Sequence, residues 1–170
     1  MRHILKRREI LPDDWYHFGE DAPVDGALIV PLAELRKDPE RWRNWSGKLG
    51  VRLSVDASYD DLTDALARLS LVAVEFPNAG DGRGYSLGRQ LRDAAGFRGE
   101  LRAVGAGVRQ DQVFLMSRCG FDSLELAPGE DLEAARRALH RYDVAYQPGS
   151  AATSPVVTIR MQRYFSANTS

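Results

Sequence analysis

The sequence has one cysteine, three lysines, three histidines and no long apolar run, and each of these shortages excludes a class of protein. Because Cys119 is the single cysteine, an internal disulfide is impossible, and nothing indicates secretion. No apolar run reaches the roughly 20 residues of a membrane-spanning helix. The first ten residues lack the apolar stretch of a signal peptide. We therefore expect a cytoplasmic protein that does not bind a membrane.

The two signs of charge are balanced, with 23 Lys and Arg against 24 Asp and Glu and a net charge of -1. Since there is no excess of positive charge, we expect no nucleic-acid partner. Lys6, Lys37 and Lys48 are the only lysines, so arginine supplies the other 20 of the 23 cations. Two explanations stay open: a genome that favours arginine codons, and recognition of oxyanions by the planar guanidinium group.

The histidines do not form a metal-binding or catalytic pattern. His3, His17 and His140 are scattered, and none stands near Cys119 at the spacing of a metal site or a Cys–His nucleophile pair. No haem, iron–sulfur, flavin or nicotinamide motif is legible in the chain. We therefore expect no metal, and the cofactor stays unknown.

Short apolar runs alternate with amphipathic stretches, which is typical of repeated βαβ units in an α/β fold. We expect strands at 27–30, 50–55, 71–76, 100–104 and 123–126, with a short sixth at 144–146, and helices at 32–45, 59–69, 85–95, 110–118 and 131–141. These are about five strand–helix units, and their connections favour a mainly parallel sheet. A closed barrel of eight units needs about 250 residues, so the chain predicts an open doubly wound sheet or a partial barrel.

A length of 170 residues suits one domain. We expect residues 1–148 to form a single α/β domain, whose first 25 residues are an irregular or hairpin-forming extension. The segment 148–155 is rich in Pro, Gly and Ser, as linkers are. We therefore expect residues 149–170 to form a linker-like tail. Three alternatives stay open for residues 156–161: a loosely ordered segment, as such tails more often are, an edge strand, or a segment that binds a partner.

The loop that follows the expected strand 71–76 has an unusual composition. In a parallel sheet each strand-to-helix loop emerges at the same edge, where ligand sites gather. This loop, at 77–86, has glycines at 80, 82 and 84, which let the backbone approach a ligand closely. We expect it to bind a small anion, and its ligand-binding candidates are Asp81, Arg83, Tyr85 and Ser86, the last as a cap of the next helix. The alternative is an Asp-Gly turn in which Asp81 and Arg83 pair with each other.

The next such loop, at 105–112, has the same character and adds Gly105, Asp111 and Gln112 as candidates. Arg102 stands inside the preceding strand, where a buried charge must be paired. Glu100 shares its face of the strand, so one interpretation is a structural ion pair. The other is a guanidinium that joins Arg83 in the anion site.

Three secondary candidates complete the set. Glu75 ends the expected strand before the first loop, where it is placed to act as an acid or base with Asp81. Arg92 lies on the following helix, and its simpler interpretation is a solvated surface residue. Arg118 stands beside Cys119, so it either lowers the pKa of that thiol or accompanies a buried, inert cysteine. No residue is identified as catalytic from these patterns.

Five short strings between residues 75 and 122 carry a more specific signal. They are Glu75-Phe76-Pro77, Asp81-Gly82-Arg83-Gly84-Tyr85-Ser86, Gly99-Glu100-Leu101-Arg102-Ala103-Val104-Gly105, Asp111-Gln112 and Arg118-Cys119-Gly120-Phe121-Asp122. Together they resemble a bacterial family of uncharacterised proteins known as domain of unknown function 934, over about residues 28–147. The resemblance implies a link to assimilatory sulfate reduction, because members are encoded beside the sulfite reductase haemoprotein and an adenylylsulfate-type reductase. It also implies the family's usual label, an oxidoreductase involved in sulfite reduction, which reflects that gene neighbourhood.

The chain departs from the family pattern in both loops. Ala79-Gly80 stand where relatives usually have Phe-Thr or a similar pair. After Gly105 the chain has Ala106 where relatives often carry an acidic residue, and one extra residue precedes Asp111. If that carboxylate is essential in the family, this chain is a divergent or repurposed member.

Three functions stay open at this point. The first is an accessory protein of sulfate or sulfite reduction that binds an oxyanion or a partner, such as sulfite reductase or the adenylylsulfate-type reductase. The second is a cofactor-dependent oxidoreductase, and the third is an assembly module without activity. A redox enzyme needs a cofactor, and since no cofactor motif is legible, the sequence favours the first.

Overall fold

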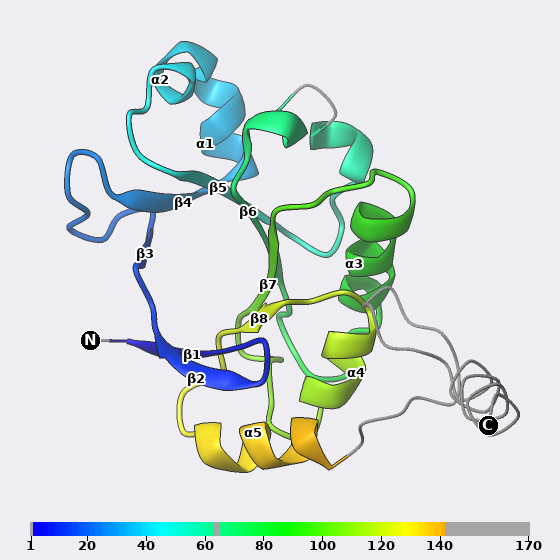
Figure 1. Ribbon diagram of the computed structural model, residues 1–170. Helices are drawn as coiled ribbons and strands as arrows, with labels where there is room; N and C mark the ends of the chain where they lie inside the picture. Colours follow the sequence, from blue (N-terminus) through cyan, green and yellow to red (C-terminus); the bar gives the residue numbers. More distant parts are fainter. Residues whose placement is uncertain (1, 63–64, 142–170) are drawn as a thin grey trace, which may run out of the picture.

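Eight strands form one curled sheet in the computed structural model, which describes residues 2–62 and 65–141 (Figure 1). The strands are β1 (His3–Lys6), β2 (Glu9–Pro12), β3 (Trp15–His17), β4 (Ala27–Pro31), β5 (Leu49–Leu53), β6 (Leu71–Glu75), β7 (Glu100–Val104) and β8 (Ser123–Leu124). Their order in space is β2-β1-β8-β7-β6-β5-β4-β3. From β3 to β8 neighbouring strands are parallel, whereas β1 pairs antiparallel with both β2 and β8.

The sheet is therefore mixed, and the expectation of a mainly parallel sheet is corrected. The difference arises at the N-terminus, where the hairpin-forming alternative is the one observed: β1 and β2 form a hairpin that extends the sheet beyond β8. The strands β3 to β8 follow one another in space as they do in the chain. A doubly wound sheet reverses its strand order, so the sheet instead matches the partial-barrel alternative.

The curl of the sheet is visible in a cluster that joins strands far apart in the strand order. Trp15 of β3 packs with Ile29, Leu71 and Val104 on the concave face, although three strands separate β3 from β7. Gly50 of β5 makes room for this packing, because a Cβ there would lie 3.1 Å from the Trp15 ring and 3.2 Å from Leu71. The concave face thus has a small apolar core of its own.

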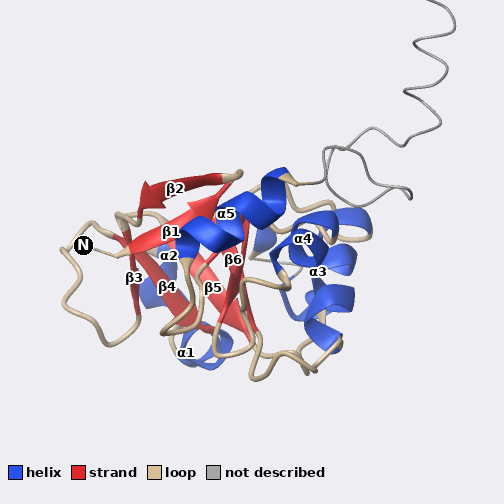
Figure 2. Ribbon diagram, turned by 90° about the horizontal axis from the view of Figure 1, so that it is seen from below, coloured by secondary structure: helices blue, strands red, loops and turns tan. Residues whose placement is uncertain are grey.

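The larger core lies on the opposite, convex face, beneath the helices. Side chains of a strand alternate between faces, so Leu101 and Ala103 of β7 enter this core while Arg102 points to the concave face. The helices α3 (Arg83–Asp93) and α4 (Val113–Arg118) lie along this convex side (Figure 2), and α5 (Leu132–His140) packs against α4 and β1.

Among the described residues, the connections before and after β5 contain only short helices. The expected helix at 32–45 is divided at Asp38, giving α1 (Leu32–Lys37) and α2 (Pro39–Arg43), and Pro39 begins the second helix. The expected helix at 59–69 is wrong, because that stretch contains two 3₁₀ turns, η1 (Tyr59–Leu62) and η2 (Leu66–Arg68). No helix within 2–62 and 65–141 is long and apolar enough to cross a membrane. The predicted strand at 144–146 and the tail at 149–170 lie outside the described residues.

Candidate functional site

Two loops lie side by side at the carboxyl edge of the sheet, as the sequence predicts. The backbone N–H of Gly107, after β7, donates to the carbonyl oxygen of Phe76, after β6, at 2.9 Å. Farther along the loops, the hydroxyl of Tyr85 donates to Oε1 of Gln112 at 2.8 Å. The first bond joins the loops near their strands, and the second joins α3 to the start of α4. Three of the predicted site residues, Tyr85, Gly105 and Gln112, belong to this junction.

Glycines are required where the two loops touch. Gly105 has a φ of +105°, and a Cβ there would lie 2.6 Å from the carbonyl oxygen of Phe76. At Gly107 a Cβ would lie 2.4 Å from the carbonyl oxygen of Asn78. Since both obstacles are backbone atoms, they cannot swing aside as a side chain does. The glycines of the second loop therefore allow one loop to pack on the other, a role that needs no ligand.

Arg83 begins α3 and is held between two aspartates. Its Nε donates to Oδ1 of Asp81 at 2.9 Å, and its Nη2 lies 2.6 Å from Oδ2. Its Nη1 also donates to Asp56, in the loop after β5. These bonds from Arg83 lower the pKa of Asp81, and the bonds to Asp81 raise the pKa of Arg83. The Asp81–Arg83 pair that the sequence left open is thus formed, and Asp56 joins it.

The Arg83 side chain remains 57% exposed despite these bonds. A second pair stands at the same edge, where Nε of Arg52 on β5 lies 3.6 Å from Oε2 of Glu75 on β6. Both of these side chains are also well exposed. The suggested pairing of Glu75 with Asp81 is not formed, because each carboxylate faces a different arginine. The carboxyl edge therefore presents two arginines in fixed ion pairs to solvent.

Arg102 lies apart from Arg83, buried in the concave face. Its side chain is 0% exposed, and its Nη1 and Nη2 lie 3.0 Å from Asp13 and 2.8 Å from Glu100. Its Nε also donates to Glu100 at 3.2 Å and to the hydroxyl of Ser123 at 3.3 Å. These groups occupy the guanidinium, so Arg102 has the surroundings of the structural ion pair rather than of an exposed anion site.

Further charged groups on the concave face lie close to Arg102 and its carboxylate partners. Nζ of Lys6 on β1 lies 2.5 Å from Glu100. Burial by itself raises the pKa of Glu100, but Arg102, Lys6 and Ser123 outweigh it and the pKa is lowered. The cluster thus ties β1 to β7 through ionised groups.

The same cluster joins β3 to the segment after β8. Nε2 of His17 lies 2.9 Å from Oε2 of Glu125, and Nε of Arg2 lies 3.0 Å from Asp13. Burial raises the pKa of Glu125, and His17, Arg2 and Arg102 together lower it below its ordinary value. Three regions distant in the sequence therefore meet around Arg102.

The remaining candidates contact other groups. Arg92 donates to the carbonyl oxygens of Phe97, Gly99 and Gly120 at 2.7–2.9 Å, which places it at the amino ends of β7 and β8, opposite the loops. Arg118 ends α4 beside buried Cys119, and burial raises the pKa of that thiol. Ser86 does not cap α3, because the helix begins three residues earlier, and it is exposed. Asp111 is exposed near Arg109, at 3.9 Å.

Comparison with known proteins places the chain in a family. The family model described as a bacterial protein of unknown function, DUF934, matches residues 50–157. The chain belongs to this family. The match includes both loops of the carboxyl edge and omits β1 to β4. No curated protein matches the chain.

The sequence did not point to Arg52, Asp56 or Asp13 in this DUF934 chain. Arg52 lies between Val51 and Leu53 in a buried strand. A charged residue inside an apolar strand is the signal that singles out Arg102, and the same signal was available for Arg52. The sequence around Asp56 carries no such signal, because exposed aspartates after a strand are common. Asp13 is 89 positions from Arg102 in the chain, so no local pattern reports their contact.

Proposed function

We propose that this DUF934 chain is an accessory protein of assimilatory sulfate or sulfite reduction, and that it acts by binding a partner protein at its carboxyl edge. The link to sulfur assimilation rests on what the family resemblance implies. The binding role rests on one observation: Arg83 is exposed and held in place by Asp56 and Asp81 at the edge where two loops meet.

A fixed pattern of exposed charge supports recognition of a partner. The two loops are joined by one backbone bond and one side-chain bond, and Arg83 is already paired with its aspartates, so this group needs little further ordering when a partner binds. Complementary charges on the partner set its orientation and speed its approach. The partners implied by the resemblance are sulfite reductase and the adenylylsulfate-type reductase.

The same geometry makes a free oxyanion the second choice. Arg83 and the two aspartates form a group with more negative than positive charges, and a sulfite or sulfate ion must displace Asp56 to reach Nη1. A protein surface offers several charges and apolar contacts together, so it repays that displacement better than one small ion does.

Binding to the two reductases tests the proposal. The chain is immobilised, and each purified reductase is passed over the native protein, over Arg83→Ala and over Arg89→Ala. Arg89 lies on the same helix and is 54% exposed, so it is a matched control. We expect Arg83→Ala to weaken binding of one reductase about tenfold, by removing the cation at the centre of the edge, and Arg89→Ala to leave it within about twofold. Equal binding by Arg83→Ala, or no binding of either reductase, contradicts the proposal.

Two further measurements separate the alternatives. Calorimetric titration with sulfite, sulfate and phosphate is expected to show no binding below millimolar concentration, whereas tight binding that Arg83→Ala abolishes assigns the edge to an oxyanion. An absorbance spectrum and metal analysis of the freshly purified protein test the oxidoreductase alternative, since a bound redox cofactor would be visible there.

A further inference from the structure

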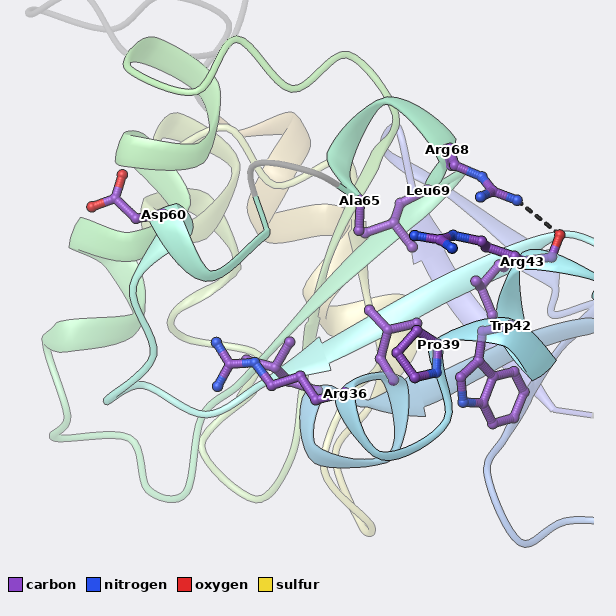
Figure 3. Close-up of a pocket in the computed structure, with 11 residues that line it drawn as sticks. Arg36, Pro39, Trp42, Arg43, Asp60, Ala65, Arg68 and Leu69 are labelled. Carbon is purple, nitrogen blue, oxygen red and sulfur yellow. Dashed lines mark hydrogen bonds between the residues drawn. The ribbon is translucent and has the colours of Figure 1, made fainter.

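A groove on the convex side lies between the helices α1 and α2 and the connection that contains η1 and η2, and no residue of the loops at 77–86 and 105–112 lines it. It has a volume of about 310 Å³, and Figure 3 shows the side chains around it. Its apolar lining consists of Leu32, Leu35, Pro39, Trp42, Leu49, Ala65 and Leu69. Its charged lining consists of Arg36, Arg43, Arg68 and Asp60.

The groove exists because the cover over β5 is incomplete. A full helix between β5 and β6 would lie across this face, but the chain there forms two short 3₁₀ turns. The neighbouring α1 has six residues and stops before Pro39. As a result Leu32, Leu35 and Leu49 are only half-buried, and apolar surface faces the groove.

The rim of the groove is positive. Nη2 of Arg68 donates to the carbonyl oxygen of Arg43 at 2.8 Å, which fixes Arg68 across the rim (Figure 3). The Arg43 guanidinium points toward Ala65 in the same view, and its Nη1 lies 2.5 Å from Glu40. With Glu40 and Asp60 counted against the three arginines, an excess of one positive charge remains.

A second cavity continues the groove beyond Trp42. It has a volume of about 390 Å³ and shares Trp42, Leu49 and Arg68 with the first. Its own lining is more polar and includes Lys48, Asp25, Ser46 and Ser70. Arg68 therefore lies at the junction between the apolar groove and the more polar second cavity.

We propose that this groove binds a small organic anion with an apolar body, such as an aromatic carboxylate. The apolar body lies on the leucines and Trp42, and the anionic group lies at Arg68 and Arg43. The volume is at the lower end of the range for small-molecule sites, and an apolar lining with a few placed polar groups is their usual composition. The site is separate from the carboxyl edge and does not depend on the proposed function.

The chain's own tail is a poorer occupant. The one apolar run there, at 156–161, contains Arg160, and Arg163 follows it. A positively charged segment meets repulsion at the rim, whereas an anion meets attraction.

Three probes of matched shape test the proposal by NMR titration of the full chain: 2-naphthoate has ring and charge, 2-naphthol has the ring alone, and acetate has the charge alone. We expect 2-naphthoate to bind below millimolar concentration and to shift the Trp42 indole and Ala65 amide signals. The other two probes are expected to bind at least about tenfold more weakly, because each lacks one half of the interaction.

Variants locate the site. The double variant Arg43→Gln/Arg68→Gln is expected to weaken 2-naphthoate binding about tenfold, and Arg137→Gln, an exposed arginine on α5, is expected to leave it unchanged. Ala65→Phe fills the groove and is expected to abolish binding. Equal binding of 2-naphthol, shifts confined to other residues, or full binding by the double variant overturns the proposal. Reductase binding by the double variant is expected to be native, so failure here is distinguishable from failure at the carboxyl edge.

Discussion

Arg83 lies in the first glycine-rich loop and Arg102 in the strand before the second, and their surroundings give them different roles. Arg83 is exposed to solvent at the carboxyl edge. Arg102 is enclosed by Asp13, Glu100 and Ser123 on the concave face. A residue in such a cluster contributes to the fold, because removing one buried charge leaves the charge of its partners only partly compensated.

We predict that Arg102→Leu lowers the free energy of unfolding by about 3–5 kcal/mol, since it removes the buried cation that Asp13 and Glu100 share and leaves them only Arg2 and Lys6. Urea denaturation followed by circular dichroism measures this change. Arg89→Leu on the surface of α3 is the control, with an expected change of about 0.5 kcal/mol or less. A loss below about 1 kcal/mol for Arg102→Leu would show that the cluster does not hold the fold.

The lowered pKa values of Glu100 and Glu125 predict a loss of stability in acid. Both carboxyls bind protons less readily in the folded protein than in the unfolded chain, where the pKa of Glu is about 4.3. The free energy of unfolding is therefore expected to be highest above about pH 5 and to fall as the pH drops through the folded-state pKa values. Urea denaturation between pH 7 and pH 3 measures this.

Glu100→Gln tests the origin of that acid sensitivity. It is expected to flatten the dependence on pH between 5 and 3, because one of the shifted carboxyls is gone. Glu133→Gln, on the surface of α5, is expected to keep the native dependence. Identical curves for the native protein and Glu100→Gln would refute the assignment.

Single residues were only partly predictable from the sequence. The Asp81–Arg83 and Glu100–Arg102 pairs lie within two positions, so local spacing indicates them. Asp56, Asp13 and Lys6 reach the same groups from 27 to 94 positions away, and only the fold brings them there.

At the level of strands and loops, the carboxyl edge is held together by backbone contacts. Gly107 donates to Phe76 while its own Cα approaches Asn78 too closely for a side chain. Gly82, in the loop at 77–86, is not confined in this way. Gly82 has a φ of -73° and open space around its Cα, so nothing in its surroundings demands glycine.

Two glycine variants therefore form a matched pair. Gly107→Ala is expected to destabilise the protein by about 1–3 kcal/mol, because its Cβ forces the two loops apart. Gly82→Ala is expected to change stability by about 0.5 kcal/mol or less. Thermal and urea denaturation of both variants measure the difference, and equal stability would mean that the loops do not pack as described.

Elements with continuous apolar runs were predictable, and the segment at 59–69 was not. Its apolar residues have helical spacing, but Asp60 and Asp61 stand at its start with Ser58 before them. Short polar side chains bond to the nearby backbone and compete with helix formation, as the Ser58 hydroxyl does with Asp60 N–H at 3.3 Å. The spacing of apolar residues does not reveal whether side-chain hydrogen bonds to the backbone compete with the helix.

For the molecule as a whole, the N-terminal strands complete a fold that the family match covers only from residue 50. Ile4 and Leu5 of β1 are 1% exposed, and Trp15 of β3 fills the concave face. The sequence indicated a hairpin here without showing where it pairs, because pairing between residues 117 and 119 positions apart, Lys6 with Ser123 and Leu5 with Leu124, has no local signal.

We predict that a fragment spanning 50–157 does not fold by itself. It lacks Asp13 and Lys6, which pair with buried Arg102 and Glu100, and it exposes the edge of β8 that β1 covers. Circular dichroism and the dispersion of amide NMR signals measure this against the full chain. A cooperative melting transition in the fragment would show that the N-terminal strands are dispensable.

Growth on sulfate tests the central claim most directly. In a strain of the source bacterium that lacks this chain, growth with sulfate as the sole sulfur source is expected to be impaired, and growth on cysteine is expected to be normal. The native chain and Arg89→Ala are expected to restore growth on sulfate, while Arg83→Ala, at native cellular levels, is expected to fail. Normal growth of the deletion strain on sulfate, or full rescue by Arg83→Ala, would contradict a role in sulfur assimilation exerted through the carboxyl edge.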